Sequence, residues 1–196
     1  MALRHLDDQD FDQATQIFKT IDIYVKRHLK EKTDYGVIPG CGEKKVLFKA
    51  GAEKLVRLFR FTTSFELIDR ITDYKDNLFH YHYRCSVYRH GELIAQGDGV
   101  ATSKETKFNR KSLICPKCGN TESVNKDKNS DSYYCWKKKG GCGANNLPKS
   151  SVMSGETSFD FNSVNTICKM SQKRSFVAAV LIASGCSDYF TQDLGI

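Results

Sequence analysis

Ile114-Cys115-Pro116-Lys117-Cys118-Gly119 opens a segment that closes with Tyr134-Cys135-Trp136-Lys137-Lys138-Lys139-Gly140-Gly141-Cys142-Gly143. Two such cysteine pairs can supply four thiolates that close a tetrahedron around one zinc ion. A glycine follows each pair and permits a tight turn. The residues between the pairs are mostly polar, so the segment could not order itself without a metal. The sequence therefore predicts a zinc ribbon with the ligands Cys115, Cys118, Cys135 and Cys142.

The second pair departs from the usual spacing, because six residues separate Cys135 from Cys142 rather than two. The alternative is four unrelated buried thiols. A catalytic zinc keeps one coordination position open, and four cysteines leave none. The expected role of the single Zn²⁺ is therefore structural.

The 196 residues suit one domain with a small appendage, and 40% hydrophobic residues suffice for one core. We expect an α+β core over residues 1–110 and 149–196, with the zinc ribbon inserted at 111–148. The net charge of +7 favours a polyanionic partner. Residues 111–148 hold seven lysines and three acidic residues, so the ribbon carries much of this surplus. The alternative is that the charge only keeps the protein in solution.

The first residues have no apolar core of signal-peptide length, and no run reaches membrane-spanning length. We therefore expect a cytoplasmic, nucleoid-associated protein with no membrane partner. In that compartment the four remaining cysteines are expected to be ordinary reduced thiols: Cys41, Cys85, Cys168 and Cys186.

Hydrophobic periodicity predicts three helices and three strands outside the ribbon. The helices are expected at residues 10–32, from Gly51 onward, and at 163–184, where Gly185 stops the last one. The strands are expected at residues 63–74, 77–89 and 93–103, after a short extended run at 45–49. Gly97 and Gly99 could mark a bulge in the third strand. The predicted fold is an antiparallel β-meander packed against the long C-terminal helix.

Two groups of cations stand out on the predicted helices. Lys49 and Lys54 flank the glycine that opens the second helix, where free N–H groups could hold a phosphate; a solvated amphipathic surface is the alternative. Lys169, Lys173 and Arg174 interrupt a final helix otherwise devoted to the core. This clustering points to a role beyond solubility.

His80 and His82 share the polar face of the second strand, and Asp98 lies on its neighbour. These three side chains could hold a catalytic metal, as in a metal-dependent nuclease. Alternating polar residues on a half-exposed strand need no such explanation.

Two further segments resemble a known family. Residues 44–59, KKVLFKAGAEKLVRLF, resemble the strand–turn–helix of the Rad fifty-two/twenty-two superfamily of single-strand annealing proteins. Residues 165–193 are similar to the C-terminal helix of phage and bacterial members, including the DNA damage response protein A group. The inserted ribbon is a departure from the eukaryotic pattern.

The resemblance implies protomers joined side by side in a homo-oligomeric ring, with single-stranded DNA in a basic groove. Lys173 and Arg174 fall at the place of a Lys-Arg pair that contacts the DNA backbone, and Phe48 at that of an aromatic residue near the strand. Charge adds further candidate DNA contacts: Lys45, Lys49, Lys54, Arg57 and Lys169.

The sequence hypothesis is ATP-independent binding and annealing of single-stranded DNA in recombination or repair, with no enzymatic activity. No Gly-x-x-x-x-Gly-Lys-Ser/Thr loop is present. Tyr133, Tyr134, Trp136 and Lys137 to Lys139 either add a nucleic-acid contact or only shield the metal and solvate a turn. The alternatives are a zinc-ribbon adaptor that binds a replication or recombination protein, and the nuclease described above.

Overall fold

The computed structural model describes residues 7–38, 44–108, 112–155 and 159–191. It has a mixed α+β fold with antiparallel strand pairs and a long C-terminal helix. The chain divides into two compact units. The first comprises residues 1–71, 80–101 and 168–196, and the second comprises residues 72–79 and 102–167.

The first unit holds most of the long helices and strands, and their order agrees with the predicted one. The bounds are α1 Asp8–His28, β1 Tyr35–Gly36, β2 Val46–Leu47, α2 Lys49–Phe59, β3 Thr62–Asp73, β4 Leu78–Arg89, β5 Glu92–Thr102, α3 Val164–Ser184 and the 3₁₀ turn η4 Cys186–Asp188. Gly185 follows α3 with φ +65°, which confirms the predicted stop.

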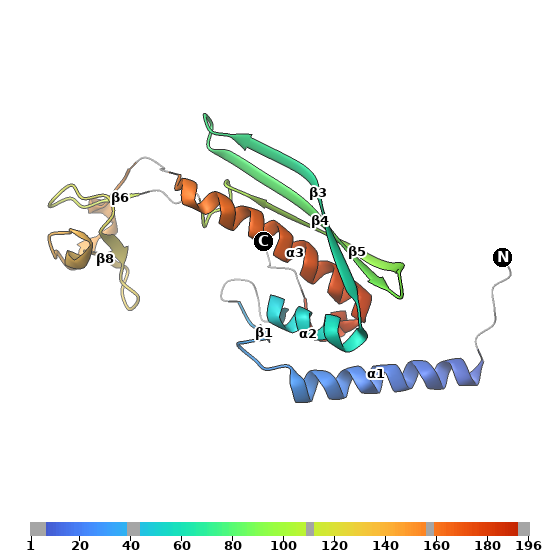
Figure 1. Cartoon of the computed structure of the whole chain (residues 1–196). Coiled ribbons are helices and arrows are strands. Elements are labelled where there is room, and N and C mark those ends of the chain that lie inside the picture. The colour runs from blue at the N-terminus through green and yellow to red at the C-terminus, as the bar shows by residue number, and fades with distance from the viewer. Residues whose placement is uncertain (1–6, 39–43, 109–111, 156–158, 192–196) are drawn as a thin grey trace. The chain divides into compact units, whose positions relative to one another are not determined.

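Strands β3, β4 and β5 form one sheet in that order, and α3 lies along one of its faces (Figure 1). The helix approaches β5 so closely that a Cβ at Gly99 would collide with the backbone of Ser171 and Ser175. Ser171 uses this proximity, because its hydroxyl accepts a hydrogen bond from the Tyr83 amide (3.2 Å) and donates one to the Gly99 carbonyl (2.6 Å). Gly97 and Gly99 therefore lie within the continuous strand β5, at the points where α3 contacts the sheet. The close approach of this helix, rather than a bulge, explains why both residues are glycine.

Helix α1 is well capped but only partly covered. Asp7 accepts from the Asp10 amide and Asp10 from the Asp7 amide, so the first turn is closed by a capping box. Within its apolar stripe, Ile21 is buried in the core whereas Phe18 is 57% exposed. Phe11 and Ile17 are also exposed, so half of the stripe is largely uncovered in the part of the chain that the structure describes.

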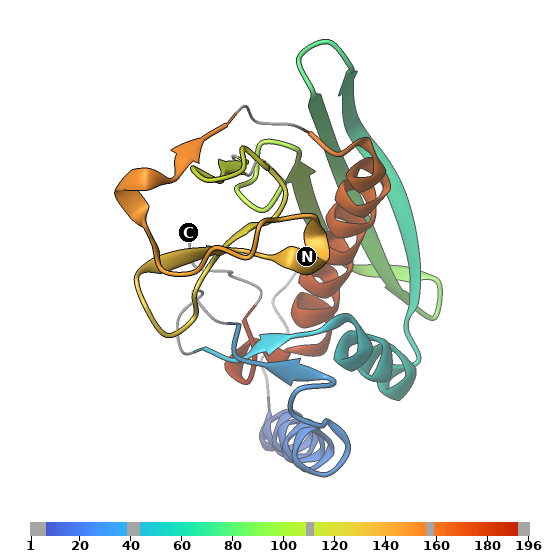
Figure 2. The ribbon, with the colours of Figure 1, turned by 90° about the vertical axis from the view of Figure 1, so that its left-hand side faces the viewer.

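The core of the first unit lies between α3, the sheet, α2 and the end of α1. All four contribute apolar side chains to it, among them Val25, Leu55, Val87 and Phe176. The two-residue strands β1 and β2 pair antiparallel beside α2 (Figure 2), with Tyr35 opposite Leu47. This pairing was not predicted, because the sequence marks residues 34–42 only as a turn-rich loop; residues 39–43 lie outside the described part of the chain.

The second unit contains the cysteine-rich module. Strands β7 Val124–Lys126, β8 Ser132–Cys135 and β9 Leu147–Pro148 run side by side (Figure 2). Strand β6 Leu113–Ile114 pairs antiparallel with β10 Met153–Ser154. Three 3₁₀ turns complete it: η1 Lys137–Lys139, η2 Lys149–Ser151 and η3 Phe161–Ser163.

This unit extends beyond the predicted insertion at residues 111–148. Aromatic packing explains the difference: the rings of Phe79 and Phe159 stack with their centroids 5.1 Å apart, and Tyr74 and Phe161 join them. The Ser103 hydroxyl adds a hydrogen bond to the Asn77 carbonyl (2.8 Å). No helix in the described residues has the length and apolar character needed to cross a membrane.

Candidate metal centre and nucleic-acid interface

The four predicted ligand cysteines come together in the second unit. Their sulfur atoms all lie within 4.8 Å of one another. The Sγ atoms of Cys115 and Cys142 are 3.8 Å apart, and those of Cys118 and Cys135 are 3.7 Å apart. A tetrahedral site with Zn–S bonds of about 2.3 Å places its sulfurs roughly 3.8 Å apart. The spacing therefore fits one tetrahedrally coordinated metal ion, and it is far too long for disulfides.

The two cysteine pairs are closed by the same hydrogen bonds despite their unequal spacing. The amide of Cys115 donates to Asn120 and its carbonyl accepts from Gly119, both at 2.9 Å. The amide of Cys135 likewise donates to Ala144 (2.8 Å) and its carbonyl accepts from Gly143 (3.0 Å). The additional residues form η1, so the longer spacing lengthens a turn without moving the sulfurs apart.

Cys135 has a polar surrounding suited to a thiolate. The Ser123 hydroxyl lies 3.0 Å from its sulfur, and the Cys142 amide donates to that sulfur at 3.3 Å. The Ser123 contact is the largest cause that lowers the pKa of Cys135, to about 6. A thiolate is the form that binds a metal. Nothing in the sequence marks Ser123 for this role, because a serine beside a strand is commonplace.

The remaining described cysteines lie apart from this cluster. Cys85 and Cys186 are buried, and burial raises the pKa of both thiols, that of Cys85 to about 11. Cys168 is half-buried against Tyr83, with its sulfur 3.7 Å from the phenol oxygen. Cys41 lies outside the described residues.

The first unit brings together residues from the two segments that carry the family resemblance. Lys173 of α3 places its ammonium nitrogen 6.0 Å from the centre of the Phe48 ring, at the start of α2. The Phe48 ring packs against Gly36, whose neighbour Tyr35 has the ammonium of Lys45 5.3 Å above its ring. Lys169 is exposed one helical turn before Lys173. We call Lys45, Phe48, Lys169 and Lys173 the basic face.

Other predicted contact residues have partners within the protomer. The Arg174 guanidinium donates to the carbonyl of Val100 on β5, so this side chain ties α3 to the sheet edge. The Lys54 ammonium lies 2.5 Å from the carboxylate of Asp34, which is fully buried. Lys54 is therefore placed to neutralise Asp34, a role that requires no phosphate.

Lys49 and Arg57 are exposed on α2. Lys49 forms a long ion pair with Glu53, at 3.5 Å, one turn further along the helix. An exposed pair of this kind contributes little stability and leaves the cation accessible. The first turn of α2 has no side-chain cap and no acidic residue.

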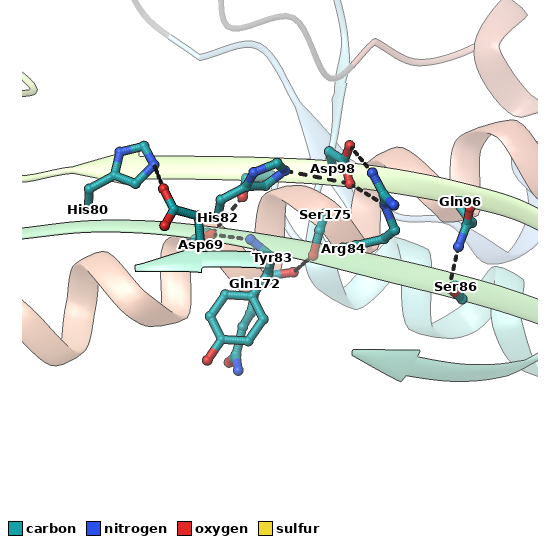
Figure 3. Close-up of polar contacts among 12 residues, drawn as sticks. Asp69, His80, His82, Tyr83, Arg84, Ser86, Gln96, Asp98, Gln172 and Ser175 are labelled. Carbon is teal, nitrogen blue, oxygen red and sulfur yellow. Dashed lines mark hydrogen bonds and ion pairs between the residues drawn. The ribbon is translucent and has the colours of Figure 1, made fainter. Parts of the chain in front are cut away.

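The polar face of the sheet forms cross-strand pairs (Figure 3). Arg84 donates from Nε and Nη2 to the two carboxylate oxygens of Asp98, at 2.9 and 3.0 Å. This contact lowers the pKa of Asp98. His82 Nε2 lies 3.7 Å from Asp98, whereas His80 pairs with Asp69 at 3.9 Å. Among the described residues the four cysteines are the only group of three or more potential ligands within reach of one ion, so His80, His82 and Asp98 do not form the metal site considered above.

Sequence reasoning missed Tyr35 and Asp34. Both precede a glycine-rich loop, and only the pairing of β1 with β2 brings them to Lys45 and to α2. The order Asp34-Tyr35-Gly36 gives no periodic signal that could have shown this.

Comparison of the chain with protein-family models, with curated proteins and with solved structures gave no match.

Proposed function

We propose that this chain binds single-stranded DNA and promotes the annealing of complementary strands without ATP, in recombination or repair. One observation carries the proposal: Lys173 lies over the ring of Phe48. These residues come from two distant segments, and the family resemblance assigns each of them to the DNA strand. Their proximity in one unit is what a shared DNA-binding face requires.

The chemistry of the basic face suits a flexible polyanion. Lys169 and Lys173 are exposed on successive turns of α3, so their ammonium groups can neutralise neighbouring phosphates. The half-buried rings of Tyr35 and Phe48 offer surfaces for bases. Such contacts carry little sequence information, and the bases that remain exposed can pair with a second strand. Base pairing then supplies the specificity.

We also interpret the fold in the terms of that family. The three-stranded sheet with α3 along it corresponds to the β-meander and C-terminal helix, and the module around the four cysteines to an inserted zinc ribbon. Zinc is the favoured metal because four thiolates in tetrahedral arrangement are characteristic of structural zinc sites, although Fe–S chemistry uses cysteine ligands as well. Elemental analysis of purified protein distinguishes the two metals.

Replacing Lys169 and Lys173 together by Ala is expected to weaken binding to single-stranded DNA and to reduce its salt dependence. Each lost phosphate contact lowers the slope of log K against log salt by about 0.7, so the double variant should lose about 1.4. Fluorescence anisotropy of a labelled oligonucleotide at several salt concentrations measures both. Lys19→Ala on α1, also an exposed lysine, is the control. An unchanged slope in the double variant would show that the basic face does not bind the strand.

Activity is tested by annealing two complementary oligonucleotides without nucleotide, beside a magnesium-containing cleavage control. We expect pairing to be accelerated and both strands to stay intact. Strand cleavage would instead support the nuclease. Failure of both binding and annealing, with the metal site intact, would support an adaptor that binds a replication or recombination protein.

We further propose that protomers assemble side by side into a homo-oligomeric ring. Strands β3 and β5 are the edges of their sheet in the described structure, and β3 exposes Phe65, Leu67 and Ile71. Exposed apolar side chains on α1 and an exposed sheet edge are features that a protein–protein contact would cover.

Size-exclusion chromatography with light scattering should give a mass well above the 22.2 kDa of one chain. Phe18→Asp should lower that mass, because it places a charge in the uncovered apolar stripe of α1. Gln16→Asp, on the opposite side of the same helix, serves as the matched control. A wild-type protein that elutes strictly as a monomer would refute the ring.

A further inference from the structure

The module around the four cysteines exposes an aromatic side chain next to a run of cations. Trp136 follows the buried Cys135 in an extended conformation, and the tryptophan is 41% exposed. The ammonium of Lys139 lies 5.8 Å from the centre of the indole ring. Lys137 and Lys138 are exposed in the same 3₁₀ turn. We call Trp136 and Lys137–Lys139 the ribbon patch.

The ribbon patch is positively charged, because it holds three lysines and no acidic residue. Within the part of the chain that the structure describes, none of the three lysines forms an ion pair. Two of the three acidic side chains between residues 111 and 148 contact other groups: Asp131 pairs with Lys126 at 2.8 Å, and Asp127 caps the following turn by accepting from the Asn129 amide. The third, Glu122, is exposed. The patch is thus a local concentration of cations with an aromatic surface.

Metal binding alone does not account for this arrangement. Four thiolates on a divalent ion carry a net charge of about −2, which nearby cations can balance. Such balance requires neither an exposed indole nor a lysine held over it. Shielding of the sulfurs would favour a buried ring, yet Trp136 is among the exposed large hydrophobic residues.

We propose that the ribbon patch is a second contact for single-stranded nucleic acid, in which a base stacks on Trp136 and Lys137–Lys139 neutralise the adjoining phosphates. Exposed aromatic rings beside cations are the usual means of holding single strands without sequence preference. An acidic peptide would use the lysines but would have no planar group to place on the indole. The inference rests on the proposed function, because it assigns an additional site for the same ligand.

Trp136 is the only tryptophan of the chain, so its fluorescence reports on this patch directly. The metal-loaded full chain is titrated with a (dT)₂₀ oligonucleotide while tryptophan emission is followed, and a parallel titration follows the anisotropy of the labelled oligonucleotide. We expect emission to be quenched with the same midpoint as the anisotropy change. A rise in anisotropy without quenching overturns the inference but leaves the proposed function standing. Absence of both signals contradicts the proposed function itself.

A poly-glutamate peptide distinguishes the remaining ligand class. Quenching by this peptide at the same concentrations as by the oligonucleotide would mean that the patch recognises negative charge in general, and would overturn the assignment to nucleic acid. We expect the peptide to give weaker quenching that disappears at moderate salt.

Variants of the patch give an independent test. Trp136→Leu should weaken single-strand binding about tenfold through loss of stacking. Replacing Lys137, Lys138 and Lys139 by Ala should lower the salt slope by about 2. Lys128→Ala, in the turn between β7 and β8, is the matched control and should change neither value. Metal content is measured for each variant to verify that the module is folded. Unchanged affinity and slope in metal-loaded patch variants would overturn the inference.

Discussion

Cys115→Ser is expected to abolish metal binding and to unfold the module of residues 112–155 while the first unit stays folded. The described core of this module is small, with Cys115, Val124, Cys135 and Leu147 as its buried members. Two of the four are the thiols themselves, so apolar packing alone contributes little and a bound metal ion would supply most of the stabilisation. Apparent free energies of zinc binding by such sites reach roughly 10–16 kcal/mol near neutral pH. The loss of one ligand therefore exceeds what the remaining contacts can replace.

Elemental analysis should find one metal ion per chain in the wild type and none in the variant. Limited proteolysis should then cleave between residues 112 and 155, whereas circular dichroism should retain the signals of α3 and the long strands. Cys168→Ser is the control, because Cys168 lies outside the cluster and should leave the metal content at one. A protease-resistant module in the metal-free variant would show that the cysteines are ordinary core residues.

Lys54→Ala should destabilise the first unit by about 3 kcal/mol, because it leaves the buried carboxylate of Asp34 without its counter-ion. This is the lower end of the range for such pairs, and it reflects the 37% exposure of the Lys54 side chain. Urea denaturation measures the change. Arg57→Ala, an exposed cation on the same helix, is the control and should stay within about 0.5 kcal/mol of the wild type.

The double variant Asp34→Asn with Lys54→Ala tests the cause. If the unpaired charge is responsible, the double variant should be more stable than Lys54→Ala alone. If it is no more stable, the loss arises from packing of the lysine stem.

The same pair predicts a dependence on pH. Burial acts to raise the pKa of Asp34, but the hydrogen bonds from Lys54 and from the Lys30 amide outweigh it, so the pKa is lowered. A lowered pKa means that the ionised carboxylate stabilises the fold above its ordinary pKa of about 3.9, and that this stabilisation is lost as the pH falls through the folded-state value. The difference in stability between wild type and Lys54→Ala should therefore shrink in acid. A constant difference down to pH 3 would contradict this account.

Much of the fold could be predicted from local patterns. Period-two alternation located β4, and the turn signal at His90-Gly91 located β5 as its partner strand. An apolar helix ended by glycine located α3 within two residues of its observed bounds. These signals are reliable because they depend only on neighbours in sequence. The four thiols could be predicted to converge because their number and spacing suit one coordination sphere.

Contacts between distant residues could not be predicted in this way. Lys54 and Arg57 look alike in sequence, yet only Lys54 meets a buried carboxylate, because β1 and β2 pair through two residues each. Arg174 follows Lys173 directly, yet its guanidinium reaches the Val100 carbonyl while Lys173 stays exposed. Likewise, Gly97 and Gly99 suggest a bulge when the sequence is considered alone, but the close approach of α3 explains them. A charge pattern shows which cations exist, whereas the tertiary fold decides which of them remain accessible.

The pairing of β6 with β10 has a practical consequence. Leu113 lies opposite Ser154 and Ile114 opposite Met153, so the polypeptide enters and leaves the cysteine-rich module through adjacent strands. A segment whose two ends meet can be excised and replaced by a short linker, or transplanted into a loop of an unrelated host, without stretching the chain on either side. We therefore expect that the module can be moved to another protein, and that a shortened chain that lacks it still folds.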